Sequence, residues 1–203
     1  MKRPGGEGRD RVFFDQLDLH RNKRSIVLNL QDSRGIEILR SLVARADVFV
    51  ENYRPDVKRR LGVEYETLSR DNPRLVYASI SGFGQSGPYR DRPGYDQIVQ
   101  GMSGLMWLTG TLEAAPLRVG IPIGDLLAGY FAAMGIMAAL LEREVSGRGQ
   151  RVETSLLEAL VGSLSFQAGQ YLNTGTVPPP VGNHHPLTAP MGVYPAKDGH
   201  LNL

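Results

Sequence analysis

One carboxylate precedes the longest uncharged stretch of the chain. Asp125 is followed by the run from Leu126 to Leu141, 16 residues without a charge, and Gly120, Gly124 and Gly129 lie around it. An aspartate at the start of a helix can act as its N-cap, accepting a hydrogen bond from an unpaired amide. It can also serve as a nucleophile, because glycines let a ligand approach closely and a helix N-terminus favours the ionised form. The spacing alone favours the cap, and the glycines argue for the nucleophile.

Other kinds of reactive site find little support. The chain has no cysteine, which excludes disulfides, thiolate metal sites and a cysteine nucleophile. Residues 82–87 fit the G-x-G-x-x-G pattern after a strand, but nearby prolines make a helix there unlikely to start, so no dinucleotide site is expected. No metal site is predicted either, because the histidines lack ligand spacing; they are His20, His184, His185 and His200.

Composition indicates a soluble globular protein. Of the 203 residues, 41% are hydrophobic and 22% charged, with a formal net charge of +2, too small to suggest a nucleic-acid partner. Basic residues cluster near the front of the chain and again at residues 58–60, which suits either a solvated surface or a polyanionic small molecule. No secretory signal is visible, and a cytoplasmic location is expected. The uncharged run is shorter than the roughly 20 residues of a membrane span. We therefore expect a helix buried on all sides and no membrane partner.

The first half of the chain reads as alternating strands and helices. Strands are predicted at Ser25–Leu30, Asp47–Glu51 and Leu75–Ile80. Helical spacing between them predicts one helix through Ile36 to Val43 and a short one around Tyr65–Ser69. This order is typical of an α/β fold with an open, mostly parallel sheet.

The second half is predicted to be mainly helical. A helix from about Asp96 to Leu108 comes first, and a long one from Asp125 ends near Gly147. A short strand at residues 151–155 and a helix at 156–172 follow. Three prolines at 178–180 then mark a linker to a new β unit. We expect a large domain over residues 1–177, with residues 178–203 forming the linker and the start of a second, smaller domain.

Several long segments, in order, resemble the class III CoA-transferases, the family of the formyl-CoA and carnitine CoA-transferases. They are HRNKRSIVLNL, ADVFVENYRPDVKRRLGV, NPRLVYASISGFGQSGPYRDRPGYDQIVQGMSGLM, GIPIGDLLAGYFAAMGIMAALLEREVSGRGQ and VETSLLEALV. The resemblance covers residues 1–203. It implies a Rossmann-like large domain that binds CoA, here without its first strand–helix unit, and an interlocked homodimer for the full-length protein.

The resemblance also implies a mechanism and a set of site residues. In such transferases the aspartate matching Asp125 attacks an acyl-CoA thioester, giving an aspartyl anhydride and then an aspartyl-CoA thioester, before CoA passes to a carboxylic acid. The CoA thioester is a substrate, and no permanently bound cofactor is implied. The positions that match the family's CoA contacts are Leu28, Asn29, Leu30, Gln31, Asn52, Tyr53, Arg54, Arg60, Gly94 and Tyr95.

Two alternatives remain within the same resemblance. The related α-methylacyl-CoA racemases carry a histidine at the position of Tyr95, where it acts as an acid and base at the α-carbon. With tyrosine in this place, transfer is favoured over racemization. The other alternative is a truncated chain that keeps part of the CoA-binding fold without turnover. The sequence does not identify the acyl donor or the acceptor acid.

Overall fold

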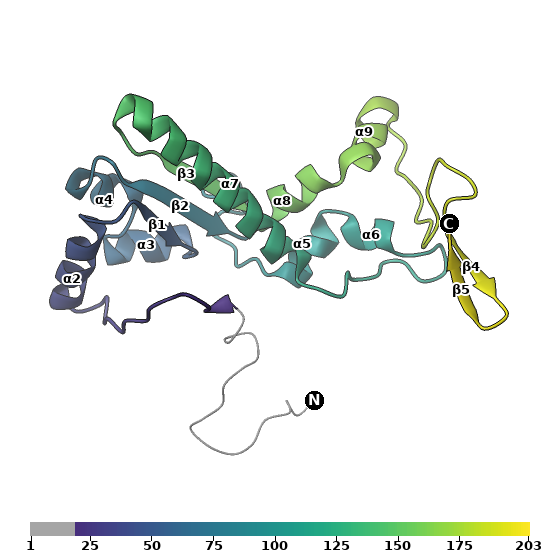
Figure 1. The fold of residues 1–203 in the computed structure, drawn as a ribbon, viewed down its shortest axis with the longest axis horizontal. Helices are drawn as coiled ribbons and strands as arrows, with labels where there is room; N and C mark the ends of the chain where they lie inside the picture. Colours follow the sequence, from purple (N-terminus) through teal and green to yellow (C-terminus); the bar gives the residue numbers. More distant parts are fainter. Residues whose placement is uncertain (1–18) are drawn as a thin grey trace, which may run out of the picture.

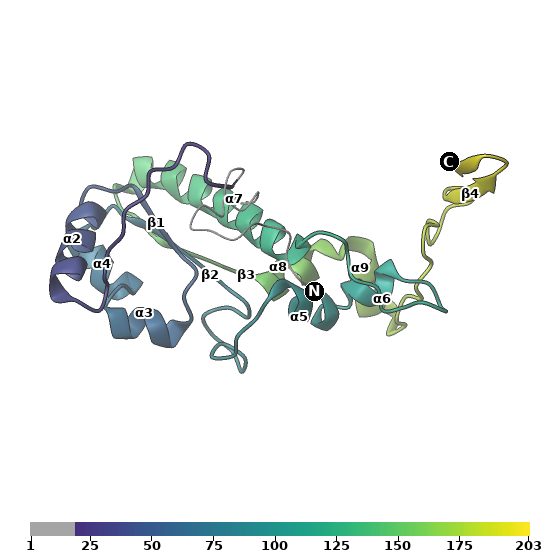
Figure 2. The ribbon, with the colours of Figure 1, turned by 90° about the horizontal axis from the view of Figure 1, so that it is seen from below.

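The protein was analysed as a computed structural model, which describes residues 19–203. These residues form an elongated molecule, with a parallel sheet at one end and a β-hairpin at the other (Figures 1 and 2). Residues 1–18 lie outside the described part, together with most of the basic cluster predicted near the front of the chain.

Three parallel strands form the sheet. They are β1 (Val48–Glu51), β2 (Val76–Ser81) and β3 (Arg151–Ser155), in the order β1-β2-β3. The register places Val50 beside Ala78 and Ala78 beside Val152. This confirms the predicted α/β class and parallel sheet, and it confirms these three strands to within a residue at each end.

Helices cover both faces of the sheet (Figure 2). On one side lie α2 (Ser33–Val43), α3 (Pro55–Leu61) and α4 (Tyr65–Asp71). Their apolar side chains enclose Tyr77 of β2 together with Val43, Val63, Leu68 and Leu75. On the other side, α7 (Ile123–Ser146) packs along β2 and β3.

Each of two helices predicted as continuous is divided in the structure. Residues 96–109 form α5 (Asp96–Met102) and α6 (Leu105–Thr109), separated by Gly104 with φ of 86°. Residues 156–174 form α8 (Leu156–Ser163) and α9 (Ser165–Thr174), and Ser165 has a φ of 51°. A left-handed residue interrupts the helical hydrogen bonds, so the axis changes direction at both points. A second apolar core joins α5, α7 and α8.

The prediction of a strand at Ser25–Leu30 is wrong. The segment has no regular structure, and Ile26 and Val27 are 63% and 94% exposed. A strand needs a neighbour to pair its amides and carbonyls. Within residues 19–203 no strand lies beside this segment.

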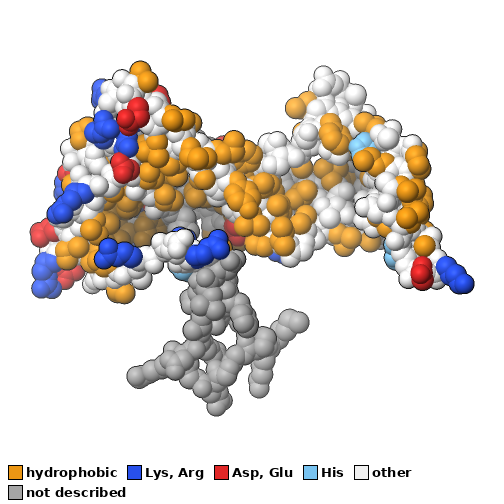
Figure 3. All heavy atoms as spheres, in the orientation of Figure 1, with side chains coloured by type: hydrophobic (Ala, Val, Ile, Leu, Met, Phe, Trp, Pro, Cys, Tyr) orange, Lys and Arg blue, Asp and Glu red, His pale blue; other side chains and the backbone are white. Residues whose placement is uncertain are grey.

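Helix α7 is buried on one face only, which corrects the expectation of burial on all sides. Its small residues Ala128, Ala132 and Ala139 are buried, whereas Tyr130 and Met134 are exposed. Figure 3 shows hydrophobic side chains gathered over this part of the molecule. With 24 residues, mean hydropathy 1.7 in its most apolar window and 22% of that window buried, α7 is long and apolar enough to cross a membrane. Core helices of soluble proteins meet the same criteria.

The chain ends in an antiparallel hairpin of β4 (Val193–Ala196) and β5 (Gly199–Asn202). This confirms the predicted β unit, with its turn at Lys197 and Asp198. The indole of Trp107 donates to the Pro178 carbonyl at 2.9 Å, which ties the proline segment to α6. The domain boundary between residues 177 and 178 remains a prediction.

Candidate active site

The direction of α7 places its first turn at the carboxyl edge of the sheet. Near its C-terminal end, Arg143 donates to the Asp47 carboxylate at 2.8 Å and to the Arg74 carbonyl at 2.9 Å. Asp47 directly precedes β1 and Arg74 lies two residues before β2, so this end of α7 lies at the amino edge. Asp125 therefore lies toward the opposite edge, where open α/β sheets bind their ligands.

Asp125 is not the N-cap of α7. The cap position is Pro122, without a side-chain bond, and Asp125 is the third residue of the helix. The amide of Gly124 donates instead to Oδ1 of Asp96, at 2.8 Å. Among residues 19–203 the Asp125 carboxylate makes no hydrogen bond or ion pair, and its side chain reaches the surface. The cap interpretation of Asp125 therefore fails, and its carboxylate is unpaired within residues 19–203.

Asp96 and Gln100 hold the entrance of α7 from one face of α5. Asp96 also accepts from Gln100 at 2.8 Å and from the Arg118 guanidinium at 3.3 Å. The fully buried Gln100 accepts from the Val119 amide at 2.9 Å and donates to the Ile121 carbonyl at 3.2 Å. Two side chains one helical turn apart thus fix both the loop before α7 and its first turn.

Close packing explains the glycine directly before Asp125. A Cβ at Gly124 would lie 3.1 Å from Val99, 3.2 Å from Oδ1 of Asp96 and 3.3 Å from Leu160. At Gly120 and Gly129 a Cβ would meet nothing within 4 Å. The backbone is therefore open at Gly120 and Gly129, while Gly124 is required by close packing, so the expectation of open backbone at all three glycines is wrong for Gly124.

Burial raises the pKa of Asp125 above its ordinary value, and the negative charge of Asp96 adds to this effect. The helix N-terminus was expected to favour the ionised form, but the net shift is upward although the side chain reaches solvent. The raised pKa and the exposed side chain are compatible, because backbone and apolar neighbours shield one side of the carboxylate from water while the other side faces solvent. A higher pKa makes a carboxylate more basic and so a better nucleophile, provided that it remains ionised.

A hollow beside α2 and α3 brings together three of the predicted CoA-binding residues. Leu30, Gln31 and Arg60 line a depression of about 570 Å³. Arg40 lines it too, but its guanidinium is engaged by Asp71 at 2.6 and 2.7 Å. For Arg60, no carboxylate partner is found in the described part of the chain. Arg60 is therefore available to an anionic ligand.

The predicted contacts at residues 28 and 29 lead into this hollow. Asn29 accepts from the amide of Gln31 at 3.0 Å through its side chain and from the amide of Asp32 at 3.1 Å through its carbonyl. Leu28 precedes this turn and is half-buried. The turn, rather than a strand, therefore positions residues 28–31.

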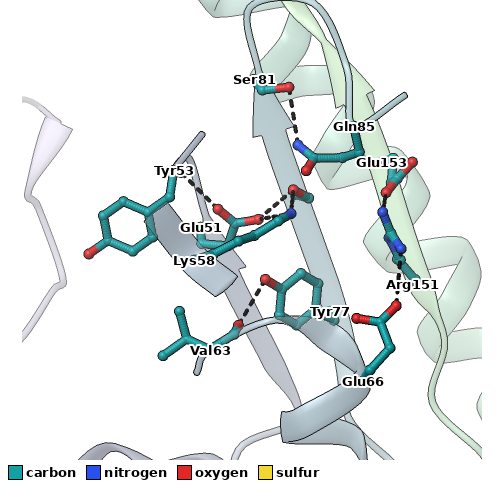
Figure 4. Close-up of polar contacts among 11 residues, drawn as sticks. Glu51, Tyr53, Lys58, Val63, Glu66, Tyr77, Ser81, Gln85, Arg151 and Glu153 are labelled. Carbon is teal, nitrogen blue, oxygen red and sulfur yellow. Dashed lines mark hydrogen bonds and ion pairs between the residues drawn. The ribbon is translucent and has the colours of Figure 1, made fainter. Parts of the chain in front are cut away.

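A second group of predicted contacts follows β1. Asn52, Tyr53 and Arg54 are exposed in the turn between β1 and α3, at the carboxyl edge of the sheet. The Tyr53 amide donates to Oε2 of the buried Glu51 at 2.7 Å (Figure 4). The turn is thus fixed from beneath while its side chains face solvent.

The last two predicted contacts lie after β2. Gly94 approaches Gly82 so closely that a Cβ at Gly94 would lie 2.6 Å from the Gly82 Cα. Tyr95 is 73% exposed and precedes α5. No helix begins near Gly87, which agrees with the exclusion of a dinucleotide fingerprint. Tyr95 is next to Asp96 and thus near the first turn of α7, whereas the hollow at Arg60 lies beside α2 and α3.

A family comparison matches residues 2–203 to CoA-transferase family III. The chain belongs to this family. It is 43% identical to succinate–glutarate CoA-transferase of Agrobacterium fabrum over 98% of the chain and 49% of that relative. It is 45% identical to acetyl-CoA:oxalate CoA-transferase of Acetobacter aceti over 89% of the chain and 46% of that relative.

A solved structure shares the fold of this CoA-transferase family III chain. The CAIB/BAIF family protein from Brucella suis superposes with a TM-score of 0.82 at 40% identity, covering 88% of the chain and 47% of that structure. The chain spans about half the length of the relatives it matches.

Sequence reasoning missed the residues that hold the first turn of α7 in this family III chain. Asp96 and Gln100 come from GYDQIVQ, in which Gly94 and Tyr95 were predicted as CoA contacts and residues from Asp96 on only as the start of a helix. Two polar residues four positions apart flank the apolar Val99, and all three are buried. Polar side chains on a buried helix face require partners, and this signal could have identified them.

Proposed function

We propose that the protein is a CoA-transferase that moves CoA from an acyl-CoA thioester to a carboxylic acid. The observation that carries this proposal is the carboxylate of Asp125, which stands unpaired in the first turn of α7 while Asp96 takes the helix cap. A free carboxylate at the carboxyl edge of the sheet suits a nucleophile. Membership of CoA-transferase family III supports the same reaction.

In the proposed reaction Asp125 attacks the thioester carbonyl, the C–S bond breaks and CoA leaves as a thiolate. The product on the protein is a mixed anhydride. The thiolate then attacks the aspartyl carbonyl, releasing the donor acid and forming an aspartyl-CoA thioester. The acceptor carboxylate attacks the aspartyl-CoA thioester, which releases the CoA thiolate and forms a second mixed anhydride. The thiolate then attacks the acceptor's carbonyl carbon, which forms the new acyl-CoA and returns Asp125 as a free carboxylate. One thioester replaces another, so no ATP is required.

We propose that the CoA contacts come from residues 28–31, from the turn after β1 together with Arg60 of α3, and from Gly94 and Tyr95 after β2. In the hollow, Arg60 is placed to pair with a phosphate group. The ring of Tyr53, partly exposed at the turn after β1, offers an apolar or adenine-stacking face. The acceptors are proposed to be small carboxylic acids, since the names of the matched relatives include succinate, glutarate and oxalate.

The full-length protein is proposed to be a cytoplasmic, interlocked homodimer. The outer face of α7 supports an interface, because Tyr130, Phe131, Met134 and Met137 are exposed on it. Such an apolar face on a soluble protein usually contacts other protein.

The transfer mechanism is tested by trapping, in the polypeptide encoded by the complete reading frame. With an acyl-CoA and an acceptor acid, hydroxylamine should convert Asp125 to a hydroxamate, seen as a mass shift of its peptide. Asp125→Ala should remove turnover and the trapped product while leaving CoA binding largely intact. Glu144→Ala is the control, since this exposed acid lies on the same helix far from the site. Turnover within a few-fold of the parent in Asp125→Ala would contradict the assignment.

Racemization is the alternative reaction and has its own signal. A racemase exchanges the α-proton of a chiral 2-methylacyl-CoA in deuterated water. Here little exchange is expected, because a phenol at position 95 is a poor proton donor and acceptor near neutral pH compared with an imidazole. Rapid deuterium uptake without a hydroxamate would favour the racemase. Neither signal in the complete polypeptide would favour a protein without turnover.

A further inference from the structure

The acid that caps α7 comes from a different helix. Asp96 is the first residue of α5, and it is 8% exposed. Its two carboxylate oxygens accept three hydrogen bonds, from the Gly124 amide, Gln100 and Arg118. The first of these lies in α7, one residue before Asp125.

Where no other residue caps a helix, its free N-terminal amides can donate to a carboxylate in the helix's own first turn. The first amides of a helix lack intrahelical partners, and an acid at the third position can bond back to them. Asp125 is that acid, and in the structure it makes no such bond within the described residues. Asp96 satisfies the nearest available amide, because Pro122 has no N–H and the Ile123 amide donates to the Ile121 carbonyl at 2.8 Å.

We propose that Asp96 is a positioning residue of the transfer site: by capping α7 through the Gly124 amide, it keeps the Asp125 carboxylate unpaired and directed toward the substrate. The inference rests on the proposed function, in which Asp125 is the nucleophile. Arg118 pairs with Asp96 at 3.3 Å, and Gln100 fixes the loop that leads into α7. Gly124 allows the approach, since Oδ1 of Asp96 would lie 3.2 Å from a Cβ at this position.

Three variants of the complete polypeptide test the inference. Asp96→Ala opens the Gly124 amide to Asp125, and kcat for transfer should fall about 100-fold, because misplacing a reacting group by about 1 Å costs this much. KM for the acyl-CoA should stay within about threefold, since CoA is held elsewhere. Asp96→Asn keeps an oxygen for the Gly124 amide and should recover part of kcat.

The matched control is Asn72→Ala. Asn72 also makes three hydrogen bonds, to the carbonyls of Val43 and Ala46 and from the amide of Arg74. It lies at the amino edge of the sheet, so its loss should lower stability comparably while kcat stays near the parent value. Equal losses of kcat in Asp96→Ala and Asn72→Ala at matched folded fractions would overturn the inference and indicate a general structural role.

A second readout does not need activity. Carbon NMR of the aspartate carboxyls, with Asp125 assigned from Asp125→Asn, should show that the pKa of Asp125 falls further in Asp96→Ala than in Asp96→Asn. Both variants lose the negative neighbour, but only Asp96→Ala frees the Gly124 amide for Asp125. Equal pKa values of Asp125 in the two variants would contradict the inference even in an active protein. If the parent transfers no CoA and yields no hydroxamate, the proposed function fails, whereas the titration still decides whether Asp96 positions Asp125.

Discussion

A buried ion pair beneath the Asn52–Arg54 turn gives the sharpest prediction about stability. The side chains of Lys58 and Glu51 are 8% and 1% exposed, and Nζ lies 3.0 Å from Oε1. Lys58 also donates to the Ser79 hydroxyl at 2.9 Å, and Ser79 donates to Glu51. Figure 4 shows the contact between Lys58 of α3 and Glu51 at the end of β1.

Lys58→Met keeps the aliphatic volume but removes the only cation that touches Glu51 in the described structure. A buried charge left without its partner costs about 3–5 kcal/mol. This is a large part of the roughly 5–15 kcal/mol by which domains are stable. In Glu51→Gln/Lys58→Met neither charge remains, and the glutamine oxygen can still accept from the Tyr53 amide. The double variant should therefore lose about 1 kcal/mol or less, so that removing both charges recovers at least about 2 kcal/mol relative to Lys58→Met, which is a coupling between the two sites.

Urea unfolding of the parent, both single variants and the double variant measures this coupling. Arg59→Met is the control on the same helix, where an exposed cation is replaced and the change should stay within about 0.5 kcal/mol. The reasoning is refuted if Lys58→Met loses less than about 1 kcal/mol, or if the losses of the single variants add up in the double variant.

Three further predictions concern the site itself. The folded state raises the pKa of Asp125, first through burial and second through the charge of Asp96. Ionisation of Asp125 therefore costs more in the folded than in the unfolded protein, and the free energy of unfolding falls as pH rises from the ordinary aspartate range through the raised pKa. Asp125→Asn should therefore be more stable than the parent at pH 7, by less than about 1 kcal/mol because the side chain reaches solvent. This gain in stability should vanish at low pH. If thermal melts show the opposite trend, the helix N-terminus dominates the ionisation of Asp125. Arg60→Ala should weaken CoA binding by about 1.5–3 kcal/mol and pantetheine thioesters far less, with Arg59→Ala as the control in calorimetry; equal losses for all ligands would indicate a folding role. Gly124→Ala should lower both stability and kcat, because a Cβ would press on Val99 and Asp96; a variant with parental kcat would show that the helix start tolerates displacement.

The sheet could be predicted from the sequence because each strand is specified locally. Residues 48–51 and 76–81 are apolar, β-branched or aromatic runs bounded by polar residues, and both appear as expected. The segment 25–30 has the same local character but no partner strand in the described residues, so it stays extended and exposed. Strand propensity predicts a capacity to pair, and pairing itself depends on distant residues.

The proposed nucleophile stands out in the sequence, but its surroundings do not. Asp125 stands out because it precedes a long uncharged run. The bond from Gly124 to Asp96 joins residues 28 positions apart. Neither spacing nor composition encodes such a contact, so the spacing alone favoured Asp125 as the cap, a position that Asp96 fills in the structure. The hollow at Arg60 likewise joins segments that are separate in sequence.

The start of α7 has two requirements, an acceptor for its free amides and an unpaired carboxylate, and Asp96 and Asp125 each meet one of them. A helix N-terminus needs an acceptor for its free amides, and the best acceptor is a carboxylate. A nucleophile needs its lone pairs unoccupied, and each amide bond that it accepts would lower its basicity. One aspartate cannot meet both demands. The fold assigns the first to Asp96, which is buried, paired with Arg118 and remote from solvent. In the proposed reaction Asp125 can then face the substrate from a stable helix end, with a pKa raised by burial and by the acid that acts as the cap in its place.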